Sequence, residues 1–187
     1  MRTGRSELRE MGAFAAAELC IDGSGAATVS TGSGFMDHML NSMAKLGSVD
    51  ISASAGGNSL YRYSLLGSAI GASLDQALGD RSGIRRYGFA AIPMDDALAE
   101  VALDLGGRAY LVMRGSFHRD TIGDLNTFEI KSVLKGITDL GRLTLHVRFD
   151  GENDHHIAES IFKALGLAIR NAVEPGSPGV LSTKGVI

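Results

Sequence analysis

The feature that most limits the folds open to this chain is an internal repeat. Shifting the sequence against itself places residues 58–78 on residues 153–173, and four of the aligned pairs are identical: Asn58/Asn153, Ala69/Ala164, Gly71/Gly166 and Ala77/Ala172. Further apolar pairs, from Leu66/Ile161 to Leu78/Val173, fall on a helical spacing. Two unrelated amphipathic helices could share such residues, but the ordered match favours a duplicated half-domain. We expect one domain of two repeats, about 1–92 and 93–187.

Hydrophobic spacing predicts the same mixture of strands and helices in both halves. In the first half, strands are expected over 13–22, 26–31 and 49–55, and helices over 35–46 and 65–78. In the second half, strands are expected over 86–92, 97–105, 109–114 and 143–149, and helices over 128–138 and 156–172. Because Trp is absent and aromatic residues make up 6% of the chain, the core must be built from Leu, Ile, Val, Ala and Met.

Charge and cysteine content exclude several classes of protein. The 18 basic and 21 acidic residues leave a net charge of −3, so no strong field favours nucleic acid or an anionic membrane. The single Cys20 excludes an internal disulfide framework and suits a reducing compartment. No apolar run reaches the ~18 residues of a membrane span, and the first ten residues lack the apolar stretch of a signal peptide. We expect a cytoplasmic protein without nucleic-acid or membrane partners.

The densest group of chemically active side chains lies in residues 152–159, with the sequence ENDHHIAE. On a helix His155 and Glu159 share one face, whereas His156 points about 100° away. An imidazole and a carboxylate at this spacing form a chelating pair, and divergent histidines could serve two metals. The alternative is a solvated helix N-terminus, with Asp154 as the N-cap and Glu159 favoured by the helix dipole.

Three other histidines differ in their surroundings. His38 follows Asp37 in the segment GFMDHML. His146 lies within the expected strand LTLHV, where a lone histidine is more often a core residue than a ligand. His118 has polar neighbours, and we expect it at the surface.

A second group is basic. Arg86 precedes Tyr87-Gly88, Arg108 follows two glycines, and Ser182 and Lys184 lie near the C-terminus. Arginine and lysine beside glycine-rich loops, with a hydroxyl group nearby, suit a phosphate. The alternative is ordinary ion pairing on the surface.

Together these residues resemble the imidazoleglycerol-phosphate dehydratase family of histidine biosynthesis. The matching segments are TGSGFMDHML (31–40), ALGDRSGIRRYG (77–88), PMDDALAEVALDLGGRAYLV (93–112), LTLHVR (143–148), GENDHHIAESIFKAL (151–165) and STKGVI (182–187). The resemblance implies a duplicated α+β fold, similar to ribosomal protein S5 domain 2, in which each half is a β-sheet with helices packed on one face. It also implies a lyase that dehydrates imidazole glycerol phosphate to imidazole acetol phosphate.

The resemblance assigns roles to the two groups of side chains. It implies manganese as the cofactor, with His38, His155, His156 and Glu159 among the metal ligands. It implies that the substrate phosphate is held by Arg86, Arg108, Ser182 and Lys184. It further implies a homo-oligomer, a 24-subunit shell built from trimers, with active sites between subunits.

The chain departs from the family pattern in its first half. Leu60, Tyr61 and Ser64 stand at the positions of three family ligands, and a further family histidine falls at Ser132. The catalytic glutamate of the family maps near Gly12, so no catalytic residue is assigned.

The missing ligands bear on metal affinity. By the resemblance each metal keeps two of four protein ligands, His155 with Glu159 and His38 with His156. Manganese is the weakest binder among the first-row divalent ions, so it depends on a full ligand set. We therefore expect sub-stoichiometric manganese. The alternative to an active dehydratase is an impaired or inactive relative that acts as a structural or phosphate-ligand-binding subunit.

Overall fold

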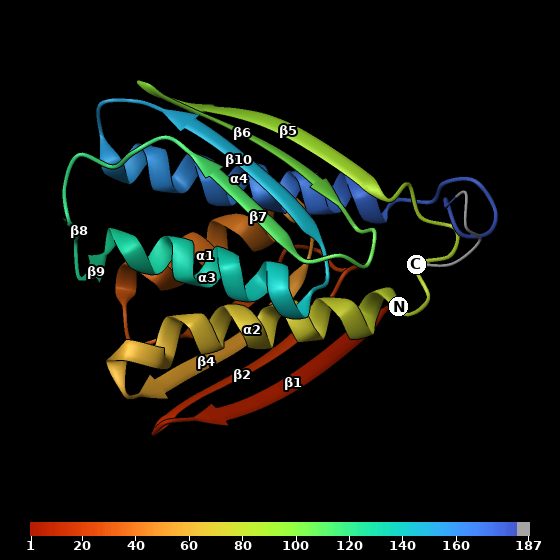
Figure 1. The fold of residues 1–187 in the computed structure, drawn as a ribbon, viewed down its shortest axis with the longest axis horizontal. Helices are drawn as coiled ribbons and strands as arrows, with labels where there is room; N and C mark the ends of the chain where they lie inside the picture. Colours follow the sequence, from red (N-terminus) through yellow and green to blue (C-terminus); the bar gives the residue numbers. More distant parts are fainter. Residues whose placement is uncertain (183–187) are drawn as a thin grey trace.

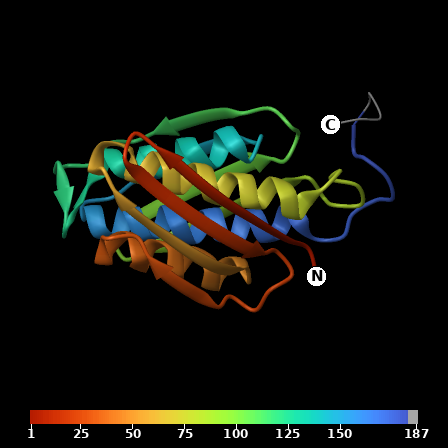
Figure 2. The ribbon, with the colours of Figure 1, turned by 90° about the horizontal axis from the view of Figure 1, so that it is seen from below.

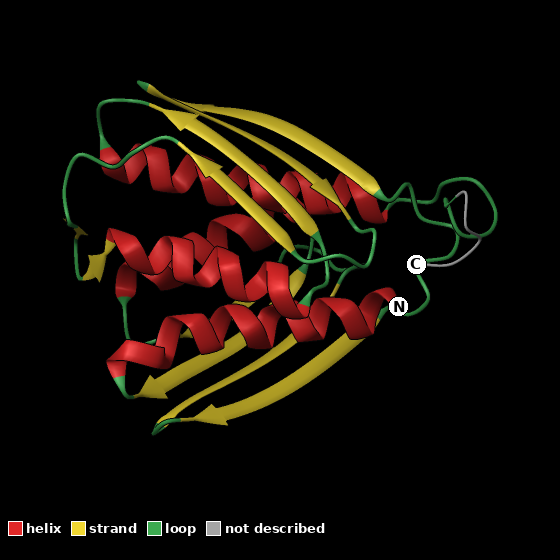
Figure 3. Cartoon of the chain, in the orientation of Figure 1, coloured by secondary structure: helices red, strands yellow, loops and turns green. Residues whose placement is uncertain are grey.

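Two four-stranded sheets form the outer layers of the chain, and the helices lie between them (Figures 1 and 3). This computed structural model describes residues 1–182. The first sheet has the order β1 (Thr3–Glu10), β2 (Ala13–Cys20), β4 (Asp50–Gly57), β3 (Ala27–Ser30). The second has the order β5 (Tyr87–Met94), β6 (Ala97–Asp104), β10 (Thr144–Asp150), β7 (Tyr110–Arg114). In both sheets the second pairing is antiparallel and the last is parallel, so the two halves share one topology.

The helices repeat as the sheets do. They are α1 (Gly34–Gly47), α2 (Ser59–Leu78), α3 (Thr127–Leu140) and α4 (Asp154–Val173), and a short hairpin of β8 (Thr121–Ile122) and β9 (Leu125–Asn126) precedes α3. The side-chain oxygens of Asn58 and Asn153 cap α2 and α4, accepting the N–H groups of Leu60 at 3.1 Å and His155 at 2.9 Å. An asparagine N-cap satisfies an N–H group that has no partner within the helix. The expected duplicated α+β fold, with helices on one face of each sheet, is confirmed.

Some details differ from the sequence-based expectations, among them the short strands β8 and β9, which were not expected. Helix α2 begins at Ser59, six residues before the expected start, because Asn58 caps it there. Strand β1 has no counterpart among the expected strands. The boundary between repeats near residues 92 and 93 remains a proposal; β5 crosses it and pairs with β6.

Small side chains allow the layers to approach closely. The inward face of β2 is mostly alanine and that of β6 is half alanine, and the core consists mainly of Ala, Leu, Ile, Val and Met, as the composition predicted. The helices pack as two parallel pairs, α1 with α4 and α2 with α3, and Figure 1 shows all four starting at the same end of the molecule. Of the helices in residues 1–182, none is long and apolar enough to cross a membrane.

Glycines set the distance within each helix pair. A Cβ atom added at Gly67 on α2 would lie 2.1 Å from the carbonyl oxygen of Val133 on α3. One added at Gly166 on α4 would lie 2.2 Å from the carbonyl oxygen of Met43 on α1. Both contacts are with backbone, so the helices would have to move apart to admit a methyl group.

We expect the substitution Gly67→Ala to lower the free energy of unfolding by about 1–3 kcal/mol, the usual cost of overpacking. Gly34→Ala is the matched control, since its Cβ would meet nothing closer than the Asp124 carboxylate at 3.9 Å. Urea denaturation of both variants measures the effect. Equal unfolding midpoints for the two variants would contradict this account of the α2–α3 contact.

Candidate active site

Three side chains with metal-ligating atoms meet where α1 and α4 begin. Glu159 Oε2 lies 3.3 Å from His38 Nε2 and 3.4 Å from His155 Nε2. One ligand atom from each residue lies within 4.8 Å of the other two. Within residues 1–182 no other group of three His, Cys, Asp or Glu side chains converges in this way. We call His38, His155 and Glu159 the triad.

The packing of α1 against α4 creates the triad. His155 and Glu159 are one helical turn apart on α4, as their spacing predicted. His38 comes from α1, which the contact at Gly166 holds close to α4. The carboxylate of Asp124, in the turn of the β8–β9 hairpin, fixes the start of α1 by accepting hydrogen bonds from the Ser33 hydroxyl at 2.7 Å and the Gly34 N–H at 2.7 Å.

Glu159 is the buried member of the triad. Its side chain is 9% exposed, whereas His38 and His155 are 46% and 47% exposed. Burial raises the pKa of the Glu159 carboxyl, but hydrogen bonds from Lys163 and His38 outweigh this and hold the pKa below its ordinary value. Lys163 Nζ donates to Glu159 Oε1 at 2.9 Å. The carboxylate is therefore ionised at neutral pH, with Oε2 turned to the two imidazoles.

The triad suits a divalent transition-metal ion. Two imidazole nitrogens and one carboxylate oxygen bind such ions and leave coordination positions open for water or substrate. A hollow lies beside it, and His155 forms part of its wall together with Arg119, Thr121, Ile122 and Glu152. A small molecule in this hollow would have direct access to His155.

His156 takes a different direction from the triad. Its Nδ1 lies 2.6 Å from Asp96 Oδ1, and its ring centre is 6.1 Å from that of His155. The expected pairing of His38 with His156 is wrong within a single chain, because α1 packs so that His38 meets Glu159 and His155 instead. The hydrogen bond from His156, and then those from the backbone N–H groups of Asn153 and Glu152, hold the pKa of Asp96 well below its usual range.

The corresponding end of α2 carries no such group. Leu60 is 80% exposed, and the Ser64 hydroxyl donates to the carbonyl oxygen of Tyr61 at 3.0 Å. On α3 the Ser132 hydroxyl donates to the carbonyl oxygen of Phe128 at 3.3 Å. The hydroxyl groups of Ser64 and Ser132 are therefore bonded to their own helices, and these positions contribute neither an imidazole nor a carboxylate.

Of the proposed phosphate residues, Arg86, Arg108 and Ser182 lie at the opposite end of the molecule. Arg86 is largely buried: its Nε and Nη2 donate to Asp104 at 2.6 and 3.0 Å, and its Nη1 donates to the carbonyl oxygen of Leu181. Hydrogen bonding to Asp104 raises the pKa of Arg86, so the guanidinium is charged. Arg108 is exposed and lies three residues after Leu105, whose backbone N–H donates to the carbonyl oxygen of Arg86 at 3.0 Å.

Ser182 is the last residue that the structure describes, and it follows Leu181, which contacts Arg86. Lys184 lies outside the described residues. Figure 2 shows the segment after α4 projecting at the same end as the N-terminus. The structure thus places Arg86, Arg108 and Ser182 at one end and leaves their joint role as a proposal.

The two groups are separated by the length of α4. The Arg86 N–H donates to the carbonyl oxygen of Ala172, near the end of this helix, whereas His155 lies in its first turn. Seventeen residues of α-helix span about 25 Å. One small molecule therefore cannot contact both groups of the same chain.

Three local expectations have clear outcomes. His146 was expected in the core, and this is wrong: it is exposed on the outward face of β10, because Leu145 and Val147 on either side point inward. His118 is at the surface as expected, 56% exposed, and its Nδ1 lies 3.1 Å from Asp154 Oδ1. The alternative with Asp154 as N-cap is also wrong, because Asn153 holds that position and Asp154 accepts the N–H groups of His118 and Arg119.

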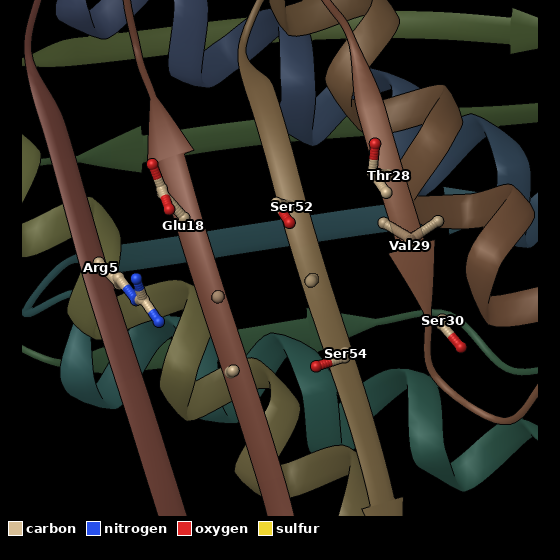
Figure 4. Close-up of a pocket in the computed structure, with 10 residues that line it drawn as sticks. Arg5, Glu18, Thr28, Val29, Ser30, Ser52 and Ser54 are labelled. Carbon is tan, nitrogen blue, oxygen red and sulfur yellow. The ribbon is translucent and has the colours of Figure 1, made fainter.

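The outward face of the first sheet is also hollowed, but it offers different chemistry. Figure 4 shows hydroxyl groups of Thr28, Ser30, Ser52 and Ser54 along it, with Arg5 and Glu18 on the neighbouring strands. Arg5 is already paired with Glu7 at 2.6 Å. This hollow contains one carboxylate and no imidazole, so the triad is the stronger candidate for chemistry.

Comparison with known proteins agrees with this arrangement. The model of the imidazoleglycerol-phosphate dehydratase family matches residues 31–169, which include the triad, His156 and both arginines. The chain belongs to this family. The imidazoleglycerol-phosphate dehydratase of Methanococcoides burtonii is 45% identical over 174 residues, covering 91% of each chain. That of Clostridium botulinum Hall is 39% identical over 193 residues, covering 100% of this chain and 95% of the relative.

Solved structures of the family share the fold. The crystal structure of imidazoleglycerol-phosphate dehydratase from Staphylococcus aureus superposes with a TM-score of 0.84 at 27% identity, covering 93% of this chain and 99% of that one. The Pyrococcus furiosus enzyme in complex with (S)-C348 also gives 0.84, at 28% identity, covering 97% and 100%. Both halves of this chain therefore have counterparts in the family fold.

Two residues beside the triad were not singled out from the sequence. Lys163 is one helical turn after Glu159, so helical spacing alone places its ammonium group by the carboxylate. Asp96 lies in the β5–β6 turn, about 60 residues before His156, and only the folded structure brings the two together.

Proposed function

We propose that this chain carries out the family reaction, the dehydration of imidazole glycerol phosphate to imidazole acetol phosphate in histidine biosynthesis. The observation that carries the proposal is the triad at the start of α4, within a chain that belongs to the dehydratase family. Imidazole is a ligand for the same ions that His38, His155 and Glu159 would hold, so the triad suits the ring of this substrate.

The triad and the basic residues would bind different parts of the complex. The triad would hold the metal, and the bound metal would supply a positive charge to the substrate imidazole. The Glu159 carboxylate, fixed by Lys163, would keep both ligating histidines in place. Arg86, Arg108, Ser182 and Lys184 would bind the phosphate through the Arg forks and the Lys charge.

The distance between these two groups bears on assembly. Because Arg86 lies about 25 Å from the triad along α4, the phosphate-binding arginine of one chain would have to meet the triad of another. A homo-oligomer, a 24-subunit shell of trimers in the family resemblance, would supply that contact. We place this assembly in the cytoplasm.

Manganese is the proposed metal, and we expect fewer than two manganese ions per chain. The residues at the start of α4 fit a divalent ion, whereas Leu60, Tyr61 and Ser64 at the start of α2 do not. The alternative to be tested is a relative with impaired turnover that acts as a structural or phosphate-ligand-binding subunit. Both readings share the fold, the triad and the phosphate residues.

Titration of the purified assembly with Mn²⁺, followed by metal analysis and a dehydratase assay, tests the proposal. We expect less than two manganese ions per chain and turnover that depends on added metal. Metal-independent binding of phosphate ligands without turnover would support the subunit role instead. Absence of both manganese binding and turnover would refute the dehydratase proposal.

A further inference from the structure

One loop of the second half of the chain touches the starts of both helices that carry the triad. The backbone N–H groups of His118 and Arg119 donate to the carboxylate of Asp154, in the first turn of α4, at 2.9 Å each. Five residues after Arg119, the carboxylate of Asp124 is bonded to the start of α1. The loop therefore joins α1 and α4 at the end where the triad lies.

Asp124 makes three hydrogen bonds at the start of α1. Its Oδ1 accepts from the Ser33 hydroxyl at 2.7 Å and from the Phe35 N–H at 3.2 Å, and its Oδ2 accepts from the Gly34 N–H at 2.7 Å. The hydrogen bond from Ser33, and then those from the two backbone N–H groups, hold the pKa of Asp124 below its ordinary value. An ionised carboxylate from the other half of the chain thus completes the N-terminal cap of α1.

Buried residues hold Asp124 in place. Ile122 and Leu125, which flank the turn of the hairpin, are 8% and 1% exposed and pair with each other as β8 and β9. Figure 1 shows this hairpin at the end where the helices start. Asp124 is therefore fixed to the core of the second half, and through its hydrogen bonds it fixes a helix of the first half.

The beginning of α1 carries two side chains that meet α4 at the triad. His38 lies four residues after Gly34, and its Nε2 is 3.3 Å from Glu159 Oε2. The ring of Phe35 lies edge-on to the ring of His155, with 5.1 Å between their centres. A binding site needs its groups within about 0.5 Å of the productive geometry. A small shift of the start of α1 would therefore move His38 out of reach of the ion.

We propose that Asp124 is a positioning residue of the metal site, which sets the start of α1 so that His38 reaches an ion at the triad. This inference rests on the proposed function, because it needs a metal there. Groups that orient a ligand contribute about 10–100-fold to metal affinity. The simpler possibility is that Asp124 only stabilises the fold, and that Asp37, which accepts the Thr31 N–H at 2.8 Å, holds α1 without it.

The substitution Asp124→Asn tests the role of the carboxylate. Asparagine has one accepting oxygen, and its amide nitrogen cannot accept the N–H of Gly34. In the full-length assembly at pH 7.5 we expect it to weaken the tightest class of Mn²⁺ sites at least about tenfold, measured by electron paramagnetic resonance of the free ion. Asp120→Asn is the matched control, because it removes a charge from the same loop and the Asp120 side chain has no hydrogen bond or ion pair within residues 1–182. Its Mn²⁺ affinity should equal that of the unmodified protein.

Two further variants separate positioning from a purely structural role. Asp124→Glu keeps the carboxylate on a longer side chain, so it should bind Mn²⁺ more tightly than Asp124→Asn. In a chain that already carries His38→Asn, adding Asp124→Asn should change the affinity less than about twofold, because the ligand that Asp124 positions is gone. Isothermal titration with Zn²⁺, which imidazole sites hold more tightly than Mn²⁺, measures this pair.

Thermal unfolding of the metal-free variants checks that each one folds. A folded Asp124→Asn variant that binds Mn²⁺ as tightly as Asp120→Asn would overturn the positioning role and leave the triad standing. An effect of Asp124→Asn that persists in full in the His38→Asn chain, or a Glu variant no better than the Asn variant, would do the same. If the unmodified protein has no tight Mn²⁺ class, the metal site of the proposed function is contradicted, and this inference with it.

Discussion

Replacing Glu159 by Gln is expected to weaken binding of a divalent ion by more than about 100-fold. Loss of a residue that merely orients a ligand costs about 10–100-fold, and Glu159 is a proposed direct ligand. The amide keeps the size of the side chain but removes the charge. It also leaves the ammonium of Lys163, now 2.9 Å from Oε1, without its anionic partner, so this positive charge would oppose the incoming cation.

Isothermal titration with Mn²⁺ and with Zn²⁺ measures this effect. Glu100→Gln is a suitable control, because Glu100 lies on the outer sheet face, loosely paired with Arg148 at 3.9 Å. Its metal affinity should equal that of the unmodified protein, and thermal unfolding should confirm that both variants fold. If Glu159→Gln binds Mn²⁺ as tightly as the control, the triad is not the metal site.

The helices and most strands could be predicted because their apolar residues follow a regular spacing. Strand β1 could not, since its sequence TGRSELRE has little apolar alternation. Its fully buried position is Gly4, where a Cβ atom would lie 2.0 Å from the carbonyl oxygen of Ser73 on α2. The strand is held against a helix by close backbone contact, which leaves no hydrophobic signal in the sequence.

The sequence predicts those contacts of the site that join residues of the same helix. His155 and Glu159 belong to one helix, so a spacing of four residues places them together. The contact of His38 with Glu159 depends on how α1 packs against α4. The spacing of residues along one helix does not predict this packing. The contact of Asp96 with His156 likewise depends on tertiary packing, and it turns His156 away from His38, its expected partner.

The exposure of His146 could have been predicted from the apolar residues that alternate with it along β10. Strand residues alternate between the two faces of a sheet. Leu145, Val147 and Phe149 all point inward, so His146 must point outward. The alternation of apolar residues around His146 therefore predicts its exposure better than the general preference of strand histidines for the core.

Restoring the lost ligands is expected to give the largest gain in metal content. In the triple variant Leu60→His, Tyr61→His, Ser64→Glu, the first turn of α2 would carry the same side-chain pattern as that of α4. The caps support this equivalence, because Asn58 and Asn153 bond to the N–H two residues later in both helices. Leu60 is 80% exposed, so the fold should tolerate its replacement, whereas Tyr61 packs against the core and its replacement requires a check that the variant folds.

We expect bound manganese per chain, measured by metal analysis after dialysis, to rise above the value of the unmodified protein. A second triple variant, with Gln at all three positions, removes the same side chains without adding imidazole or carboxylate, and its manganese content should not rise. The new ligands reach a metal only if α2 itself, rather than the loop before it, sets their position. The matching caps and equal lengths of α2 and α4 indicate that the helix does so. An unchanged manganese content in a folded Leu60→His, Tyr61→His, Ser64→Glu variant would show that the loop controls the geometry of the first-half site.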